Sequence, residues 1–332
     1  MKTTAIVNSN IALVKYWGKR DEKLILPNNS NISVAYDKLN TITTVEFNLD
    51  YSKDIFILDS NEITDGPVFK KTTEHLNIIR QKAGIETRAK VVSKNNFPTA
   101  AGLASSASGF SALAFAGSKA AGLNLDQREL SILARLSGSG SASRSLIGGF
   151  AEWMKGEKAD GSDSYAIQIA KPDYWPEFRI IVAIISEARK KTSSTDGMNL
   201  TVKTCPLYQG WLNTIEQDLE NVRKGIAEKN FTLIGSTAEF NCLKMHATMI
   251  TTQPSLIYWM PETLEIIHSV LDWRKQGLEG YFTIDAGPQV KIICLEKDVE
   301  EINNKLCSIP SVKKTIICKV GKEAILTDNH LF

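Results

Sequence analysis

One uncharged run of small residues, PTAAGLASSAS from Pro98 to Ser108, constrains the local fold of this chain most strongly. It leads directly into the apolar stretch GFSALAFAG, so a turn must become a buried helix within a few residues. The first backbone N–H groups of a helix lack intrahelical partners, and the helix dipole adds positive charge there. The segment therefore predicts either an anion site or an alanine-rich core helix with an ordinary cap.

The same segment offers specific groups to a phosphate. Gly102 permits a close approach of the backbone, and the hydroxyls of Ser105 and Ser106 could cap the helix, bind phosphate or reach a metal ion. The sequence contains no G-x-x-x-x-G-K-[ST] motif, so a P-loop nucleotide site is excluded.

A second glycine-serine segment, SGSGSASRS from Ser137 to Ser145, surrounds a single arginine, Arg144. Its glycines expose backbone N–H groups, and its hydroxyls flank the guanidinium, so the segment offers several hydrogen-bond donors. The alternative is a flexible surface loop with a solvated arginine.

An aspartate follows a short apolar strand in FTIDAGPQV, residues 282–290. Asp285 at such a position is a common turn former. Beside a phosphate-binding loop, its carboxylate could instead take a proton from a hydroxyl nucleophile.

Several cations gather near the N-terminus in NIALVKYWGKRDEK, which includes Lys15, Lys19, Arg20 and Lys23. Strand alternation would place Lys15 and Trp17 on one face of a strand. A cluster of this kind suits a multiply charged anion, and the alternative is a solvated edge strand protected by lysines.

The remaining pattern mixes strands and helices without regular alternation, which predicts an α+β fold. We expect strands near 3–7, 41–49, 54–60, 89–93, 179–186, 281–296 and 313–321, and helices near 71–84, 109–122, 127–136, 211–230, 262–277 and 299–306. Gly84 is expected to end the first helix, and Asp126 with Glu129 to form a capping box. A change of character after the strand at 179–186 suggests an N-terminal domain, 1–185, and a C-terminal domain, 186–332.

Composition excludes several classes of protein. The formal net charge of +2 includes no polybasic arm, which argues against nucleic acid as a partner. Five cysteines without CxxC spacing argue against a disulfide framework or a zinc site. We find neither a signal-like segment nor an apolar run of membrane-spanning length, and expect a cytoplasmic protein with no membrane partner.

Taken together, these segments resemble a known family. PTAAGLASSAS is similar to the P-x-x-x-G-L-x-S-S phosphate loop of the GHMP kinase superfamily, and DAGP to its third motif. More narrowly, NIALVKYWGKRDE, SGSGSASRSLIGGFAEW, KMHAT and YFTIDAGPQVK resemble the mevalonate diphosphate decarboxylase family. This resemblance extends from about residue 8 to about residue 293.

The resemblance implies a GHMP kinase fold, with an S5-like N-terminal part, a ferredoxin-like C-terminal part and the active site in the cleft between them. It also implies ATP and Mg²⁺ as cofactors and a homodimeric assembly. The implied reaction phosphorylates the 3-hydroxyl of mevalonate 5-diphosphate, then expels phosphate and carbon dioxide to leave isopentenyl diphosphate.

The resemblance also assigns residues. Asp285, Arg144 and Lys15 match catalytic positions, and Arg144 is expected to hold the substrate carboxylate. The expected substrate contacts also include Tyr16, Lys19, Ser139, Gly140, Ser141 and Ser194. The expected ATP contacts are Ser93, Gly102, Leu103, Ala104, Ser105 and Ser106, with Ser106 also a candidate Mg²⁺ ligand.

Three positions depart from the family pattern: Thr195 stands where some bacterial members have Arg, and Asn31 and Tyr36 stand where Ser and Leu are expected. Three other functions stay open at this point. They are a decarboxylase of mevalonate 5-phosphate, a 3-kinase without decarboxylation, and a non-catalytic GHMP-like sensor.

Overall fold

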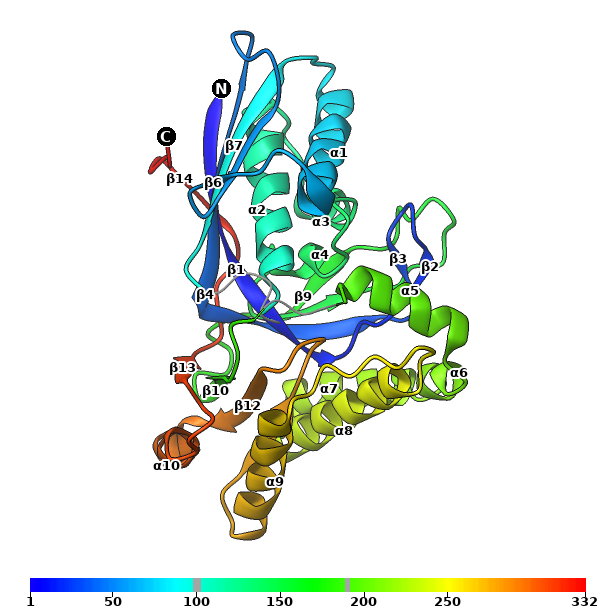
Figure 1. The fold of residues 1–332 in the computed structure, drawn as a ribbon, viewed down its shortest axis with the longest axis vertical. Helices are drawn as coiled ribbons and strands as arrows, with labels where there is room; N and C mark the ends of the chain where they lie inside the picture. Colours follow the sequence, from blue (N-terminus) through cyan, green and yellow to red (C-terminus); the bar gives the residue numbers. More distant parts are fainter. Residues whose placement is uncertain (98–102, 189–191) are drawn as a thin grey trace.

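Two separate β-sheets organise the chain in a computed structural model that describes residues 1–97, 103–188 and 192–332. The first sheet lies in the upper half of Figure 1 with helices α1 to α4, and the second lies below it with the later helices. A small ribbon of β2 (Lys19–Asp21) and β3 (Leu26–Pro27) projects beside them.

The first sheet has eight strands among the described residues, with the path β14-β1-β4-β7-β5-β6 and with β8 and β9 attached through β4. Its long central strands are rich in β-branched residues, which favour the extended backbone. The strands are β1 (Lys2–Val14), β4 (Asn31–Asn48), β5 (Ile55–Leu58), β6 (Asn61–Glu62), β7 (Arg88–Asn95), β8 (Phe150–Trp153), β9 (Ala166–Ala170) and β14 (Ile325–Thr327).

Helix α2 (Ser105–Ala120) packs on this sheet against β1 and β4, and its small residues allow the close approach. Around it lie α1 (Gly66–Ala83), α3 (Gln127–Arg135) and the short α4 (Ala142–Ser145). Buried apolar side chains of these helices and of the sheet form one continuous core.

The second sheet has the order β11-β12-β10-β13, and its neighbouring strands are antiparallel. The strands are β10 (Phe178–Ile184), β11 (Gly280–Thr283), β12 (Val290–Leu295) and β13 (Lys314–Cys318). The helices of this part are α5 (Ser194–Thr204), α6 (Tyr208–Leu212), α7 (Ile215–Glu228), α8 (Phe231–Ile250), α9 (Pro261–Lys275) and α10 (Val299–Cys307), with a 3₁₀ turn at Glu296–Asp298.

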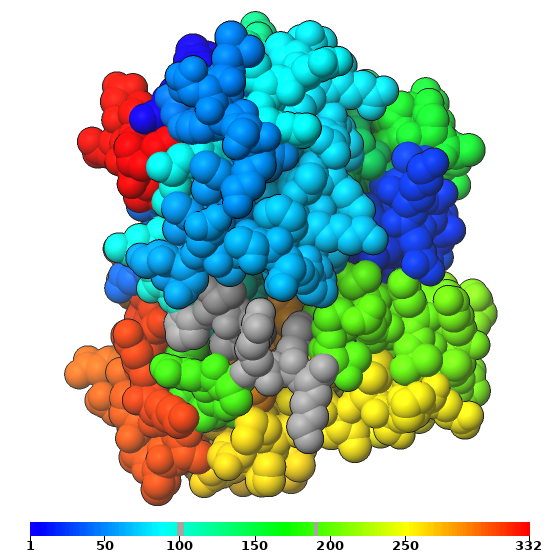
Figure 2. All heavy atoms as spheres, turned by 45° about the horizontal axis from the view of Figure 1, so that its top comes forward, coloured from blue at the N-terminus to red at the C-terminus, as the bar shows by residue number. Residues whose placement is uncertain are grey.

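The two halves are joined by more than one crossing of the chain. Strand β10 precedes residue 186 yet belongs to the second sheet, and β14 returns near the C-terminus to pair with β1. Figure 2 shows most of the blue and cyan N-terminal segments above the yellow-green, yellow and orange ones, with the red C-terminal tail beside the upper part. A domain boundary between residues 185 and 186 stays a prediction.

Most expected elements are present, and the cap predictions are confirmed. Gly84 adopts φ 64° after α1, and Asp126 and Glu129 form the reciprocal capping box of α3. Three expectations are wrong. The segment 281–296 is not one strand but two, β11 and β12, with a turn between them, and the helix expected at 211–230 is divided between α6 and α7. Lys15 to Trp17 follow the end of β1 at Val14 and do not lie in a strand. Nor is Lys15 solvated, since only 1% of it is exposed.

Candidate active site

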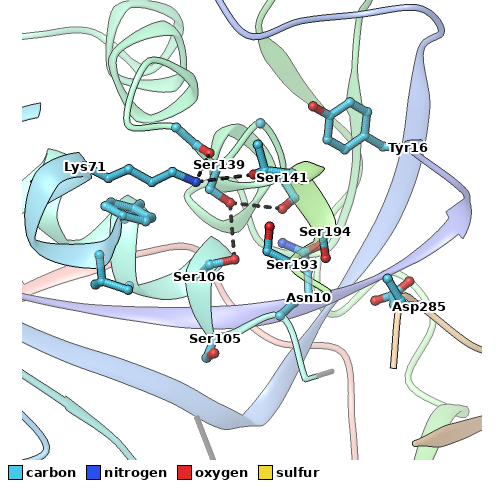
Figure 3. A pocket seen from close by; sticks show the side chains of 18 of the residues that line it. Asn10, Tyr16, Lys71, Ser105, Ser106, Ser139, Ser141, Ser193, Ser194 and Asp285 are labelled. Atoms are coloured by element: carbon cyan, nitrogen blue, oxygen red, sulfur yellow. Dashed lines mark hydrogen bonds between the residues drawn. The ribbon is translucent and has the colours of Figure 1, made fainter. Parts of the chain in front are cut away.

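A cavity of about 380 Å³ lies between the two halves, a size that suits small-molecule ligands. It brings together side chains from the end of β1, the start of α2, the loop before α4, the start of α5 and the turn after β11 (Figure 3). Its lining includes most of the residues expected from the sequence: Lys15, Tyr16, Lys19, Ser93, Ala104, Ser105, Ser106, Ser139, Gly140, Ser141, Arg144, Ser194 and Asp285.

An ion pair joins two segments that are 270 residues apart in the sequence. Lys15 Nζ donates to Asp285 Oδ1 at 2.8 Å. Lys15 is 1% exposed in its side chain, whereas Asp285 is 28% exposed and faces the cavity. Burial of the Asp285 carboxyl acts to raise its pKa, but the positive charges of Lys15, Lys291 and Arg144 outweigh it, and the pKa is lowered. Asp285 is therefore an ionised carboxylate at neutral pH.

Arg144 lies on α4, lines the same cavity and is 3% exposed. Asn31 Oδ1 accepts a hydrogen bond from its Nη1, and Asn10 Oδ1 lies 3.5 Å from its Nη2. Its Nε is buried and has no partner among the described residues. Burial lowers the pKa of Arg144 to about 10, which leaves the guanidinium charged at neutral pH. An acidic ligand would satisfy the free donor.

The loop before α4 needs a glycine where it meets an aromatic pair. A Cβ on Gly140 would lie 2.4 Å from Trp153 Cη2 and 3.0 Å from the Tyr16 hydroxyl. Trp153 is held by a hydrogen bond from Nε1 to Ser164 Oγ at 3.0 Å. The Tyr16 hydroxyl is buried without a partner among the described residues, so it has hydrogen-bonding capacity left for a ligand.

Two lysines extend the positive charge along the cavity. Burial lowers the pKa of both Lys19 and Lys71, and the charge of Lys71 lowers that of Lys19 further. Lys71 Nζ donates to Gly138 O at 3.4 Å and to Thr195 Oγ1 at 3.3 Å. Two partly buried cations on one cavity, one of which lowers the pKa of the other, would gain from an anion beside them.

Lys71 was not among the residues expected from the sequence. Its signal is a cation on the inward face of a helix, four residues before the fully buried His75. Asn10, which lies near Arg144, and Ser193, which caps α5, also line the cavity and were not expected. No motif distinguishes these two residues in the sequence.

The start of α2 faces the cavity with unusual backbone geometry. Ala104 precedes the helix with φ 54°, in the left-handed region, and no side chain caps the first turn. Ser106 Oγ lies 3.4 Å from Ser139 Oγ, and Figure 3 shows these hydroxyls turned toward one another. The helix therefore presents its N-terminus and serine hydroxyls to the cavity together, a combination that suits phosphate oxygens.

The remaining expected residues differ in position. Ser93 lies on β7 and shares a hydrogen bond of 2.9 Å with Thr43. Leu103 is packed in the core at 1% exposure, and its carbonyl accepts from Ser9 Oγ at 2.8 Å. Gly102 lies outside the described residues.

Two of the three departures from the family pattern contact the site directly. Asn31 accepts from Arg144, and Thr195 accepts from Lys71. The third, Tyr36, is fully buried on β4, and its hydroxyl has no partner among the described residues.

Residues 1–97, 103–188 and 192–332 contain no group of three or more His, Cys, Asp or Glu side chains that could hold a metal ion. A magnesium ion here would need the oxygens of a bound phosphate as ligands beside Ser106 or Asp285, which is how Mg²⁺ is usually held in phosphoryl-transfer sites. In the same part of the chain, no helix is long and apolar enough to cross a membrane.

Comparison with known proteins gives consistent matches along the chain. A family model described as the diphosphomevalonate decarboxylase-like N-terminal domain matches residues 7–166. A second, described as the mevalonate 5-diphosphate decarboxylase C-terminal domain, matches residues 180–328. The diphosphomevalonate decarboxylase of Candida albicans is 38% identical over 307 residues, which cover 88% of this chain and 84% of that protein.

Solved structures confirm the expected α+β GHMP kinase fold. Mevalonate diphosphate decarboxylase from Staphylococcus aureus matches with a TM-score of 0.93 and 39% identity, covering 98% of both chains. A complex of MDDEF with MVAPP, AMPPCP and magnesium matches with a TM-score of 0.92 and 42% identity, covering 98% of this chain and 99% of that one. With both family models and these relatives in agreement, the chain belongs to the diphosphomevalonate decarboxylase family.

Proposed function

We propose that this chain uses ATP to decarboxylate mevalonate 5-diphosphate, producing isopentenyl diphosphate, ADP, phosphate and carbon dioxide. The observation that carries this proposal is the ion pair of Lys15 and Asp285 in the same cavity as Arg144. The cavity thus places a carboxylate, an ammonium and a guanidinium around the space for one substrate. A non-catalytic sensor would have no need of this arrangement.

The charges of the cavity favour a substrate with two anionic ends. Arg144 would bind the carboxylate, using donors that its contacts with Asn10 and Asn31 leave free. Tyr16, Lys19, Lys71 and the loop at Ser139–Ser141 would bind the diphosphate. The charge of Lys71, which lowers the pKa of Lys19, favours the diphosphate over the monophosphate, because a more highly charged group compensates both lysines better.

In the first step, the substrate 3-hydroxyl oxygen bonds to the γ-phosphorus of ATP, and the bond from that phosphorus to ADP breaks. Asp285 would orient this hydroxyl and accept its proton as the new bond forms. Lys15 would stabilise the negative charge that develops on the transferring group.

In the second step, the C3–O bond breaks and its electron pair leaves with phosphate. The bond to the carboxylate carbon also breaks, and its electron pair becomes the new double bond as carbon dioxide departs. Arg144, which donates a hydrogen bond to Asn31, would keep the carboxylate aligned for this elimination.

The start of α2 and the hydroxyls of Ser105 and Ser106 would receive the phosphates of ATP, and Ser93 also lines the cavity. Mg²⁺, when bound with the nucleotide, neutralises charge on the phosphate oxygens. Ser106 is our candidate for a protein ligand of that ion.

Asp285→Asn tests the proposal most directly. The amide keeps the size of the side chain but cannot accept the proton, so we expect turnover to fall by about 10³-fold or more, with both substrates still bound. Purified protein is supplied with ATP, Mg²⁺ and either the diphosphate or the monophosphate, and ADP and carbon dioxide are measured together.

Each outcome of this assay has a defined meaning. ADP without carbon dioxide would indicate a 3-kinase, and turnover of the monophosphate alone would reassign the substrate. Near-normal turnover by Asp285→Asn would remove Asp285 from the proposed mechanism. A homodimer stays a prediction that the family resemblance supports, and a cytoplasmic location stays a prediction from the sequence.

A further inference from the structure

The segment that carries Asp285 emerges from an edge strand. In the described part of the chain, β11 pairs with β12 on one side and has no strand on the other. An edge strand leaves a row of backbone N–H and C=O groups without strand partners. Thr283 and Ile284 are fully buried, so groups left unpaired there would be costly.

Helix α8 supplies the missing partners from its side chains. Glu239 Oε2 accepts from Phe282 N at 3.1 Å. Cys242 Sγ accepts from Ile284 N at 3.1 Å and donates to Ile284 O at 3.4 Å, and His246 Nε2 lies 3.3 Å from that carbonyl oxygen. The spacing of three and then four residues puts all three side chains on one face of α8. They take the place of a neighbouring strand.

The protonation of His246 follows from this contact. A carbonyl oxygen only accepts hydrogen bonds, so the ring must carry its proton on Nε2. Burial, with a smaller contribution from the charge of Lys15, lowers the pKa of His246 to about 3. The ring is therefore neutral in the working range of pH, and it also packs against Trp259 at a centroid distance of 4.6 Å.

The same helix holds the other half of the ion pair. Asn241 Oδ1 accepts from the backbone N of Lys15 at 2.8 Å. Asn241 is in turn fixed by donating to Asp218 Oδ2 at 2.6 Å, and Lys244 Nζ donates to the same oxygen at 2.6 Å. Asn241 is 0% exposed, so water does not compete for these bonds.

We propose that α8 is the positioning element of the active site. Its Asn241 sets the backbone at Lys15, and its Cys242 and His246 set the backbone directly before Asp285. One helix thereby fixes both partners of the 2.8 Å contact between Lys15 Nζ and Asp285 Oδ1. Catalytic groups held by regular elements keep their geometry better than groups on free loops.

This inference rests on the proposed function, because positioning matters only if Lys15 and Asp285 act on the substrate. None of the three α8 residues, Asn241, Cys242 and His246, lines the cavity. They are therefore positioning residues, and their effect should fall on turnover rather than on substrate binding.

The test compares His246→Phe with His246→Gln. Phe keeps an aromatic ring against Trp259 but removes the N–H donor, whereas Gln keeps a donor. We expect His246→Phe to lower kcat by about 10- to 100-fold, with KM for both substrates changed by less than about twofold. His246→Gln should recover most of the lost kcat.

The matched control is Thr248→Val on the same helix. Thr248 is 1% exposed, and its hydroxyl donates to Met245 O within α8, so its removal leaves β1 and β11 untouched. An equal loss of kcat in Thr248→Val, or no recovery in His246→Gln, would overturn the inference.

A second measurement needs neither substrate nor the ring of His246. Amide hydrogen exchange at residues 282–286 should be faster in Cys242→Ala than in wild type, and near wild-type rates in Cys242→Ser, which keeps a donor and acceptor. Unchanged exchange in Cys242→Ala would contradict the positioning role. If the wild-type protein showed no turnover, the proposed function would be wrong. The exchange experiment would still test whether α8 fixes the backbone before Asp285, because it does not depend on turnover.

Discussion

Gly140 is the residue at which the loop Ser139–Ser141 packs against the core. Trp153 is fully buried and anchored to Ser164, so it cannot move away from an added methyl group. With the new Cβ 2.4 Å from the Trp153 ring, Gly140→Ala should displace the loop. We expect the free energy of unfolding to fall by about 1–3 kcal/mol and KM for the diphosphate to rise. Urea denaturation and steady-state kinetics measure the two effects.

Gly210→Ala is the control for this substitution. Gly210 lies within the short helix α6, where an added Cβ meets nothing within 4 Å. Its stability should stay equal to wild type or rise slightly, because Ala is the better helix former. If Gly140→Ala behaved like Gly210→Ala, the close packing against Trp153 would be without consequence.

Single residues also show what sequence can and cannot reveal. Asp285, Arg144 and Lys15 stand in distinctive short motifs, and their side chains do face one cavity. Lys71 stands in an ordinary amphipathic helix, so only the tertiary packing brings it to Thr195. The effect of Asn31 on Arg144 likewise depends on a contact across 113 positions of sequence.

At the scale of an element, the start of α2 stores backbone strain. Ala104 has φ 54°, a conformation that costs a non-glycine residue about 1–2 kcal/mol. Ala104→Gly should therefore relieve this strain and raise the free energy of unfolding. Because Gly also increases the conformational entropy of the unfolded chain, the net increase should be below about 1 kcal/mol. Ala121, at the other end of α2, has φ −82° and serves as the matched position. Thermal or urea unfolding should show a gain in stability for Ala104→Gly and a loss for the matched variant Ala121→Gly. A loss of stability in Ala104→Gly would show that the backbone at Ala104 is not strained.

The ends of helices were predictable where a short motif of neighbouring residues sets them. The capping box of α3 and the glycine after α1 act through neighbouring residues, and both were predictable. The early start of α1 at Gly66 has a local cause too, because Pro67 occupies its first turn. Helix α5, by contrast, has only a weakly apolar face and follows residues outside the described part. Its place beside Lys71 comes from the fold as a whole.

At the scale of the whole molecule, polar contacts tie the two sheets together. Arg223 on α7 binds Glu152 on β8 in bidentate fashion, at 2.9 and 2.6 Å. Thr283 donates to Ala12 O at 3.3 Å beside the pair of Lys15 and Asp285. With β10 and β14 also crossing between the halves, we expect the chain to unfold as one cooperative unit.

Two buried histidines, one in each half, make the stability of the folded chain depend on pH. His75 on α1 has no partner for either ring nitrogen among the described residues, and burial lowers its pKa to about 3, as it does for His246 on α8. Between pH 6.5 and 3, the unfolded chain binds protons at these positions and the folded protein does not. Stability therefore falls as the pH falls through this window, by about 1.4 kcal/mol per pH unit for each histidine. Asp285 adds no pH dependence in the upper part of this window, because a carboxyl with a lowered pKa begins to lose its contribution only below about pH 4, the ordinary aspartate pKa.

His75→Leu removes one of the two buried histidines, the one on α1, and leaves His246 on α8 in place. Leucine has a similar volume and no ring nitrogen, so at pH 7.5 the variant should be as stable as wild type or more so. At pH 5 it should retain about 2 kcal/mol that wild type loses, because 1.5 pH units separate that pH from the ordinary histidine pKa. Urea denaturation at intervals from pH 7.5 to 5 gives both curves, and the slope for His75→Leu should be shallower below about pH 6.5. Parallel curves would mean that His75 is protonated in the folded protein or stays neutral in the unfolded one.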